Sequence, residues 1–297
     1  MKLPIFRQMA YISPSSFLTW RKCQYKIYLE KQSGFSYPQQ KPTIHAQVGI
    51  AFDAFVKDFL ARKHNIKSPI LHLDRMLVNC QPDEINLGKE LAKKYVQSKI
   101  FQPLLNASEI YLEQETHRVI GGIPLLGRID IIADGQVLDL KVRGYKAKTK
   151  TSPTSGYCSK WVWHNEPYNK WIDQGTNLVS GLLEKAREEW AVQALFYNWI
   201  ICQSPMQSWV HEIVIQDTDA CLAEHKGEFS DKFIETIRKE LEEMWDQLTD
   251  HFYFSNIDEP RPAVSVCEAY SSLCDVANLC KYYKETLGNP ERRTMYV

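Results

Sequence analysis

The sequence lacks any long apolar run. Hydrophobic residues make up 44% of its 297 residues, yet none of their runs approaches the roughly 20 residues that a helix needs to cross a bilayer. The first residues, MKLPIFRQ, also lack the apolar stretch of a signal peptide. These two absences argue against a membrane-spanning or secreted protein. We therefore expect a cytoplasmic protein without a membrane partner.

The sequence also lacks an excess of charge of either sign. Its 36 Lys and Arg residues balance 36 Asp and Glu residues, so any contact with nucleic acid must come from a local basic patch. The 24% of charged residues is ordinary for a globular protein, and 297 residues can bury a substantial core. We expect one domain over 1–297, with an N-terminal segment (1–43), a core (44–215) that carries an insertion at about 144–180, and a C-terminal segment (216–297).

Hydrophobic periodicity and turn residues predict an α/β protein. A period near 3.6 predicts helices at about 13–31, 44–63, 82–101, 184–203 and 226–252. Alternation of apolar and polar residues predicts strands at 110–120 and 208–215.

The stretch from Leu126 to Lys141 predicts a β-hairpin. Two runs with β-branched residues flank Asp134-Gly135, a dipeptide that tolerates the positive φ angles of a tight two-residue turn. With these two residues in the loop, counting outward places Asp130 directly opposite Asp139, where Cβ atoms lie about 4.5–5.5 Å apart. The opposite face would carry the apolar side chains of Ile129, Ile131, Leu138 and Leu140.

Two carboxylates at such a short distance repel each other unless a cation or a shared proton lies between them. A hard divalent ion, Mg²⁺ or Mn²⁺, held by Asp130 and Asp139 would remove that repulsion. Lys141, which with Arg128 forms the next pair on this face, would then orient a water molecule or stabilise charge on a phosphate. The alternative is a surface hairpin whose acidic pair is offset by Arg128 and Lys141, and the spacing alone favours neither interpretation.

Gly127-Arg128-Ile129-Asp130 followed by Asp139-Leu140-Lys141 resembles the core motif of the PD-(D/E)XK nuclease superfamily. It is similar in particular to the RecB-like branch, in which a G-x-x-D strand precedes a D-x-K strand. The resemblance implies an α/β fold with a central mixed sheet flanked by helices. It also implies that Asp130 and Asp139 are metal ligands and that Lys141 is the catalytic lysine.

Two further motifs, and the cysteine segments described below, follow the order of that family. Gln193 and Tyr197 resemble its Q-x-x-x-Y motif, which implies contact with the substrate strand. Gly49 and Asp53 share a helix face and resemble its G-x-x-x-H motif, except that Asp53 stands where the family has a metal-binding histidine. A carboxylate there is a candidate ligand for Mg²⁺ or Mn²⁺, and the alternative is an exposed helical aspartate. Glu115, on the strand before the hairpin, is a further candidate metal ligand.

The stretch 141–150, which follows the hairpin, contains basic residues and no acidic ones. Tryptophans and tyrosines interleaved with basic residues come next. Basic groups attract phosphates and aromatic rings stack on bases, so this composition suits a channel for single-stranded nucleic acid. The alternative is a surface insertion that packs its own aromatic side chains. The candidate substrate-binding residues are Arg128, Arg143, Lys146, Lys148 and Tyr197.

Three cysteines lie close together near the C-terminus, at Cys267, Cys274 and Cys280. Four thiolates hold zinc or an iron–sulfur cluster, and Cys23 is the natural fourth ligand. The segment around Cys23 is similar to the start of RecB-like nucleases in which one N-terminal and three C-terminal cysteines bind [4Fe-4S]. The resemblance therefore implies a [4Fe-4S] cluster that joins the two ends of the chain, with zinc or no metal as alternatives.

Taken together, these motifs predict a metal-dependent DNA nuclease that acts as an exonuclease on single strands or DNA ends. Asp53 in place of histidine leaves a second prediction open, a non-catalytic DNA-binding subunit that keeps the fold. A third is an enzyme that works only with protein partners, as in a recombination or CRISPR-adaptation complex.

Overall fold

The computed structural model describes residues 11–24, 26–27, 44–68, 71–145, 181–185, 187–203, 206–216 and 219–249. Internal contacts divide the chain into two compact units. Unit 1 comprises Met1–Gln40, His117–Leu126 and Ile234–Val297, and unit 2 comprises Lys41–Thr116 and Gly127–Phe233. Among the described helices, none has both the length and the apolar character that crossing a bilayer requires.

Within the described residues, the sheet has six strands in the order β1-β2-β3-β5-β6-β4. Its strands are β1 (Ile110–Ile120), β2 (Ile123–Ala133), β3 (Gln136–Tyr145), β4 (Gly181–Leu182), β5 (Gln207–Gln216) and β6 (Asp219–Glu228). Strand β3 runs parallel to β5, and β4 runs parallel to β6, while β2 pairs with β3 and β5 with β6 in antiparallel fashion. The predicted α/β fold with a mixed sheet flanked by helices is confirmed.

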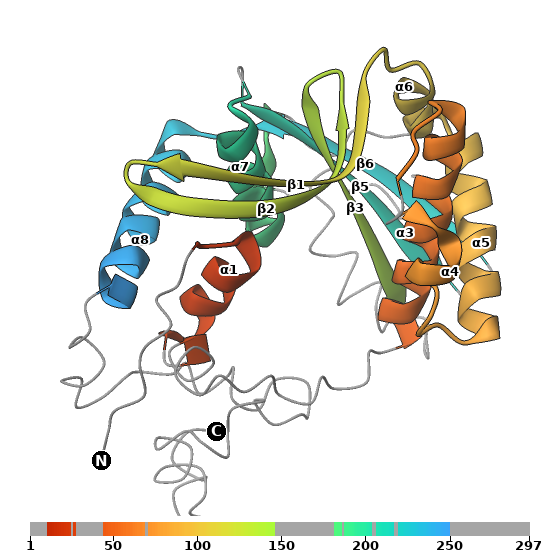
Figure 1. Ribbon diagram of the computed structural model, residues 1–297, viewed down its shortest axis with the longest axis horizontal. Helices are drawn as coiled ribbons and strands as arrows, with labels where there is room; N and C mark the ends of the chain where they lie inside the picture. Colours follow the sequence, from red (N-terminus) through yellow and green to blue (C-terminus); the bar gives the residue numbers. More distant parts are fainter. Residues whose placement is uncertain are drawn as a thin grey trace, which may run out of the picture. The chain divides into compact units, whose positions relative to one another are not determined.

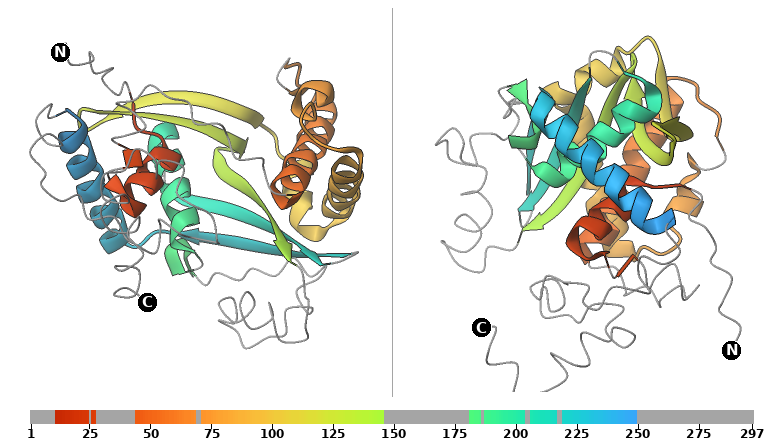
Figure 2. Two further views of the ribbon diagram at one scale, coloured as in Figure 1. Left: turned by 90° about the horizontal axis from the view of Figure 1, so that it is seen from below. Right: turned by 90° about the vertical axis from the view of Figure 1, so that its left-hand side faces the viewer.

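Helices cover both faces of the sheet in unit 2 (Figures 1 and 2). They are α3 (Ile44–Lys63), α4 (Leu73–Met76), α5 (Pro82–Gln97), α6 (Gln102–Leu105) and α7 (Glu188–Ile201), with short 3₁₀ turns at Lys99–Phe101 and Leu183–Lys185. The main core lies between α3, α5 and the sheet, where Phe52 and Leu91 pack with Leu138. Because side chains alternate along β3, Val137 instead packs with Tyr197 of α7.

The β2–β3 turn forms at the predicted dipeptide. Asp134 and Gly135 have φ angles of 48° and 76°, as a tight hairpin turn requires. The carboxylate of Asp134 accepts hydrogen bonds from Ser108 Oγ at 2.6 Å and from the backbone N–H groups of Ser108 and Glu109 at 2.9 and 3.0 Å. The hairpin is thus fixed by an acid that both tolerates the turn geometry and satisfies neighbouring donors.

Unit 1 contains α1 (Pro14–Lys22) and most of α8 (Asp231–Thr249), together with the part of β1 and β2 at 117–126. Ser13 begins α1 as its N-cap, with Pro14 at the first helical position. Trp20 of α1 donates a hydrogen bond to Gln247 of α8 at 2.8 Å. The Ile12 N–H donates to the Pro124 carbonyl at 2.8 Å, so the start of the chain adds a bridge alongside β2.

Several predicted boundaries were wrong. The helix expected to reach residue 31 is interrupted at Cys23, which forms the C-cap of α1 with an extended backbone, and the described residues 24, 26 and 27 are helical again. The helix expected from 226 begins at Asp231, because residues 219–228 form β6 instead. Charged residues hide this strand in the sequence: His225 in β6 is fully buried and pairs with the equally buried Glu212 of β5 at 3.2 Å. Buried polar pairs of this kind break the apolar alternation that predicts strands.

Candidate active site

Strands β2 and β3 pair over three residues beyond the turn and then separate, and the site lies where they separate. Their register pairs Ala133 with Gln136, then residues 132 with 137 and 131 with 138, as predicted, and goes no further. Asp130 does not continue the ladder as a cross-strand pair. Its carboxylate accepts a hydrogen bond at 3.3 Å from the backbone N–H of Leu140. The expected pairing of Asp130 directly opposite Asp139 is therefore wrong, because the side chain of Asp130 occupies a position at the edge of β3.

A change of side-chain direction in β2 explains this geometry. Ile129 packs with Ile132 and Val137 on the α7 side of the sheet, not with Leu138 and Leu140 on the α3 side as expected. Residues 129 and 132 point to the same side although they are three apart, so the strict alternation of a strand is interrupted between them. Asp130 lies at this interruption and points toward α3.

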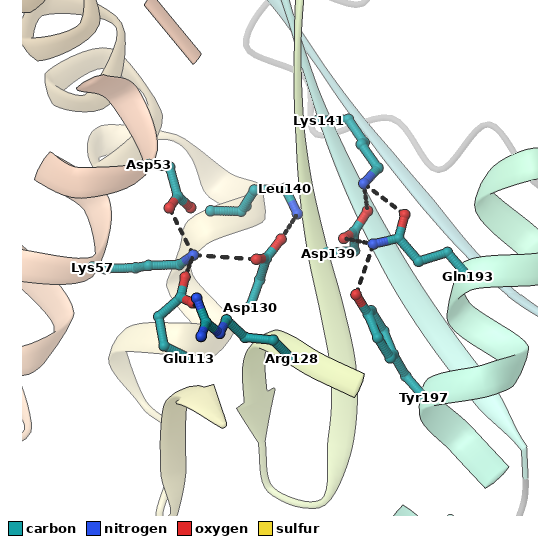
Figure 3. Close-up of polar contacts among 10 residues, drawn as sticks. All are labelled: Asp53, Lys57, Glu113, Arg128, Asp130, Asp139, Leu140, Lys141, Gln193 and Tyr197. Carbon is teal, nitrogen blue, oxygen red and sulfur yellow. Dashed lines mark hydrogen bonds and ion pairs between the residues drawn. The ribbon is translucent and has the colours of Figure 1, made fainter. Parts of the chain in front are cut away.

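Two polar clusters meet at the edge of β3 (Figure 3). We call the first the Lys57 cluster, which consists of Asp53, Lys57, Glu113 and Asp130. We call the second the Lys141 cluster, which consists of Asp139, Lys141, Gln193 and Tyr197. Both belong to unit 2, and Figure 3 shows β3 between them.

The Lys57 cluster is centred on an ammonium group that the sequence analysis missed. Lys57 Nζ lies 2.7 Å from Asp53 Oδ2 and 3.2 Å from Asp130 Oδ1, and it also contacts Glu113 Oε1. The Lys57 side chain is 1% exposed. Burial opposes its charge, but the negative charges of Asp130, Asp53 and Glu113 outweigh burial and raise the pKa of Lys57. Lys57 is therefore a permanent buried cation.

The Lys141 cluster is a closed set of hydrogen bonds. Lys141 Nζ lies 2.6 Å from Asp139 Oδ2 and donates to Gln193 Oε1 at 3.0 Å. The Gln193 amide donates to Asp139 Oδ1 at 3.2 Å and to the Tyr197 hydroxyl at 2.8 Å. Gln193 and Tyr197 lie one turn apart on α7, so the helix presents both to β3. The amide of Gln193 thus fixes the positions of the carboxylate and the amine together.

The carboxyl groups of the two clusters influence one another. Burial, helped by the negative charge of Asp130, raises the pKa of Asp139 to about 7. Burial likewise raises the pKa of Asp53 to about 7, with Asp130 adding to the effect. Burial also disfavours the ionised form of Asp130, but Lys57, Lys141 and a hydrogen bond from Asp139 outweigh it and lower the pKa of Asp130. Neighbouring acids with such divergent pKa values indicate a centre that lacks enough positive charge for all of them.

A groove gives access to these acids. It has a volume of about 320 Å³ and runs between the first half of α3 and β3. Its lining residues are Ala46, Gly49, Ile50, Phe52, Asp53, Asp130, Leu140, Lys141 and Val142. Gly49 keeps the groove open, since a Cβ atom at this position would lie 3.5 Å from the Val142 Cβ. The predicted G-x-x-x-D face of α3 therefore lines the entrance to the acids.

The predicted glycine of the hairpin motif also has a structural reason. A Cβ atom on Gly127 would lie 2.8 Å from Ile200 Cδ1 and 3.1 Å from two ring carbons of Tyr197. Only glycine lets β2 approach α7 this closely. The close approach holds the Tyr197 ring in place beneath Gln193.

The remaining predicted residues lie at the exposed side of the Lys57 cluster, elsewhere in the fold, or outside the described residues. Arg128 is 64% exposed, pairs at 3.2 Å with Glu115, which is itself 51% exposed, and lies 3.9 Å from Glu113 of the Lys57 cluster. Glu113, not Glu115, is the glutamate of β1 that belongs to the Lys57 cluster. Cys23 is buried at the end of α1. Outside the described residues lie Lys146, Lys148, Cys267, Cys274, Cys280 and the side chain of Arg143.

The three predicted metal ligands are divided between the clusters. Within the described residues, no group of three or more His, Cys, Asp or Glu side chains is placed to hold a metal ion as these side chains now stand. Asp53 and Asp130 surround Lys57, and Asp139 pairs with Lys141. Asp130 and Asp139 nevertheless fit a divalent ion, because their oxygen atoms are hard ligands and a bridging cation would relieve the repulsion that raises the pKa of Asp139.

Comparison with known proteins gives one family. The family model described as the PD-(D/E)XK nuclease superfamily matches residues 11–281. A search of curated protein sequences finds no match. A crystal structure from Eubacterium rectale, provisionally described as an exonuclease, shares 13% identity, with 96% of this chain and 93% of that chain covered and a TM-score of 0.50. The structure of SSO0001 has 14% identity, covers 94% of this chain and 90% of that chain, and has a TM-score of 0.37.

Proposed function

The chain belongs to the PD-(D/E)XK nuclease superfamily, and from this membership we propose that it is a Mg²⁺- or Mn²⁺-dependent deoxyribonuclease. We propose further that it acts as an exonuclease on single strands or DNA ends. One observation carries the catalytic part of the proposal. Asp130 and Asp139 meet at the edge of β3, beside the Lys141 amine that Gln193 holds in place.

We propose the following roles for the residues of the site. Asp130 and Asp139 would hold the divalent ion, which when bound supplies a Lewis acid that polarises a phosphate oxygen. Lys141 would orient the attacking water and stabilise charge that develops on the phosphate. Gln193 would keep the Lys141 amine in this position through its hydrogen bond at 3.0 Å. An in-line attack needs such fixed groups because misplacement of a reacting atom lowers the rate strongly.

Tyr197 is suited to contact the substrate. Its hydroxyl oxygen accepts the hydrogen bond from Gln193, so its own proton is directed elsewhere. Burial, followed by the negative charge of Asp139, raises the pKa of Tyr197 and keeps this proton in place. We propose that Tyr197 donates it to a phosphate oxygen of the bound DNA strand. Arg128 is exposed and would contact the same backbone, together with the basic residues Arg143, Lys146 and Lys148.

We also propose that the chain belongs to the RecB-like branch and holds a [4Fe-4S] cluster through Cys23, Cys267, Cys274 and Cys280. The family match supports a single nuclease domain, since it spans residues 11–281 and so includes all four cysteines. Iron and sulfide analysis of protein purified without oxygen tests this assignment. Four irons per chain with a brown colour agree with it, and stoichiometric zinc without iron contradicts it.

Incubation with DNA labelled at the 5′ or the 3′ end tests the main proposal. Single-stranded and double-stranded DNA and single-stranded RNA are compared in EDTA, Mg²⁺ and Mn²⁺. The proposal expects metal-dependent release of short products from one labelled end of DNA. Asp139→Asn and Lys141→Met should each lower the rate at least about a hundredfold. Lys239→Met is the matched control, because Lys239 forms an exposed ion pair with Glu235 at 2.8 Å. This variant should cleave DNA at the normal rate.

A partner-dependent enzyme is the second candidate, favoured by the divided metal ligands. If the protein binds DNA but does not cleave it in either Mg²⁺ or Mn²⁺, independent nuclease action is excluded. Full cleavage by Asp139→Asn would exclude the proposed catalytic centre.

A further inference from the structure

Lys57 occupies the position of a cation among three acids. Its Nζ is surrounded by the carboxylates of Asp53, Glu113 and Asp130, with distances of 2.7 Å to Asp53 and 3.2 Å to Asp130. The side chain is 1% exposed. An isolated lysine is costly to bury, and the three acids share this buried ammonium with one exposed guanidinium, that of Arg128, which lies 3.9 Å from Glu113. The three acids together carry enough negative charge to bind a divalent ion in its place.

The backbone of Glu113 supports this view independently. Glu113 has a φ angle of 52° in the middle of the described strand β1. Among the residues that the structure describes, the other non-glycine residues with positive φ angles are Asn65 and Cys202, each just after a helix, and Asp134 in the hairpin turn. A left-handed conformation is unfavourable for such a residue inside a strand. Here it accompanies a carboxylate that contacts Lys57, which is the pattern of strain held at a functional site.

Asp130 belongs to two possible cation positions at once. Its Oδ1 contacts Lys57, while its Oδ2 accepts the Leu140 N–H and its carboxyl group interacts with Asp139. The position between Asp130 and Asp139 lies beside the groove that Asp130 and Lys141 line. The position among Asp53, Glu113 and Asp130 is filled by Lys57. A divalent ion placed there would lie against the ammonium group, and like charges at that distance repel strongly.

We propose that Lys57 is a built-in cation that fills one of two cation positions, so that the active site binds one divalent ion, through Asp130 and Asp139, and not two. This inference rests on the proposed function. Lys57 is a positioning residue: it holds the Asp130 carboxylate at the edge of β3 and leaves the Asp139 side of the centre for the ion. Asp53 is then a partner of Lys57 and not a metal ligand.

Counting bound Mn²⁺ tests the inference without relying on cleavage. Free Mn²⁺ is measured by its paramagnetic resonance signal during titration of the full chain, and the number of tightly bound ions is obtained for each variant. The unmodified chain should bind one ion, which Asp139→Asn should remove. Lys57→Met should bind two ions, because the vacated position keeps its three carboxylates. Lys57→Arg keeps the positive charge, is the matched control, and should bind one.

A charge-balanced variant covers the case in which Lys57→Met fails to fold. Lys57→Met combined with Glu113→Gln removes one positive and one negative charge, and it should also bind two ions. Two tightly bound ions on the unmodified chain would overturn the inference but leave the nuclease assignment standing. One ion on both the unmodified chain and the folded Lys57 variants would do the same. No bound ion and no cleavage by the unmodified chain would instead overturn the proposed function itself.

Discussion

Replacing Asp139 with asparagine should make the metal-free protein more stable while it removes the activity. The Asp139 side chain is 3% exposed, and burial raises its pKa from 3.8 to about 7. Its ionised form is therefore unfavourable in the folded state. Asparagine has nearly the same shape and carries no charge, and its side-chain oxygen can still accept the hydrogen bond from Gln193. The substitution thus removes the electrostatic cost and keeps most of the packing.

The size of the effect follows from the pKa of Asp139. A pKa that lies about three units above its ordinary value corresponds to about 4 kcal/mol of unfavourable free energy for the ionised form, at ~1.4 kcal/mol per unit. This value already includes the favourable contact with Lys141, which opposes burial. Lys141 retains its hydrogen bond to Gln193 in the variant. We expect a gain of about 2–4 kcal/mol in the free energy of unfolding at about pH 8.

The gain should depend on pH in a defined direction. Between pH 3.8 and about 7 the folded state holds a proton on Asp139 that the unfolded state has lost, so the stability of the unmodified protein falls as pH rises through this range. The advantage of the variant is therefore complete above about pH 7 and shrinks as pH falls toward 3.8. Urea unfolding in EDTA, followed by circular dichroism at about pH 8 and about pH 5, measures it.

Asp134→Asn is the matched control, because hydrogen bonds from Ser108 and Glu109 lower the pKa of Asp134. Its ionised form stabilises the hairpin, so this variant should be less stable than the unmodified protein at about pH 8, and the difference should disappear at low pH. An Asp139→Asn protein that is equally stable or less stable in EDTA at pH 8 would refute the assignment of a buried, electrostatically strained carboxyl.

Three further substitutions test the groove and the Lys141 cluster. Gly127→Ala should lower stability by about 1–3 kcal/mol, because the new Cβ would lie 2.8–3.1 Å from α7 side chains; urea unfolding measures this, and kcat should fall as the Tyr197 ring shifts. Gly49→Ala should raise stability by up to about 1 kcal/mol through helix propensity but raise KM, since it narrows the groove; an unchanged KM would argue against substrate in the groove. Tyr197→Phe should lower kcat/KM about tenfold through loss of a hydrogen bond to the substrate, with the fold intact by circular dichroism.

The sequence predicts the elements that carry regular patterns. The α3 helix spans Ile44–Lys63 as expected, and the hairpin turns at Asp134-Gly135. Both depend on local signals, an apolar stripe with a period near 3.6 and a dipeptide suited to positive φ angles. The members of the Lys141 cluster also come together as the motifs predict, because β3 and α7 each present their residues at regular spacing.

The sequence does not predict the Lys57 cluster, for a physical reason. The contacts of Lys57 with Glu113 and Asp130 join residues 56 and 73 positions apart, and they depend on irregular backbone in β1 and β2. Positive φ at Glu113 and the interrupted alternation near Asp130 leave no periodic signal. Only the i, i+4 spacing of Asp53 and Lys57 on α3 offers a local hint. The sequence alone therefore assigns Asp53 to the metal.

The built-in cation gives a reason for aspartate at position 53. In the family motif that the α3 segment resembles, this position holds a histidine that contacts metal. A neutral histidine can bind a metal ion, but it provides no negative charge to balance an ammonium group. A carboxylate at position 53 does, and Asp53 makes a contact of 2.7 Å with Lys57. The two residues therefore make sense as a pair: the aspartate that departs from the motif offsets the charge of the lysine one turn later, and that lysine supplies the positive charge that a metal ion would otherwise provide.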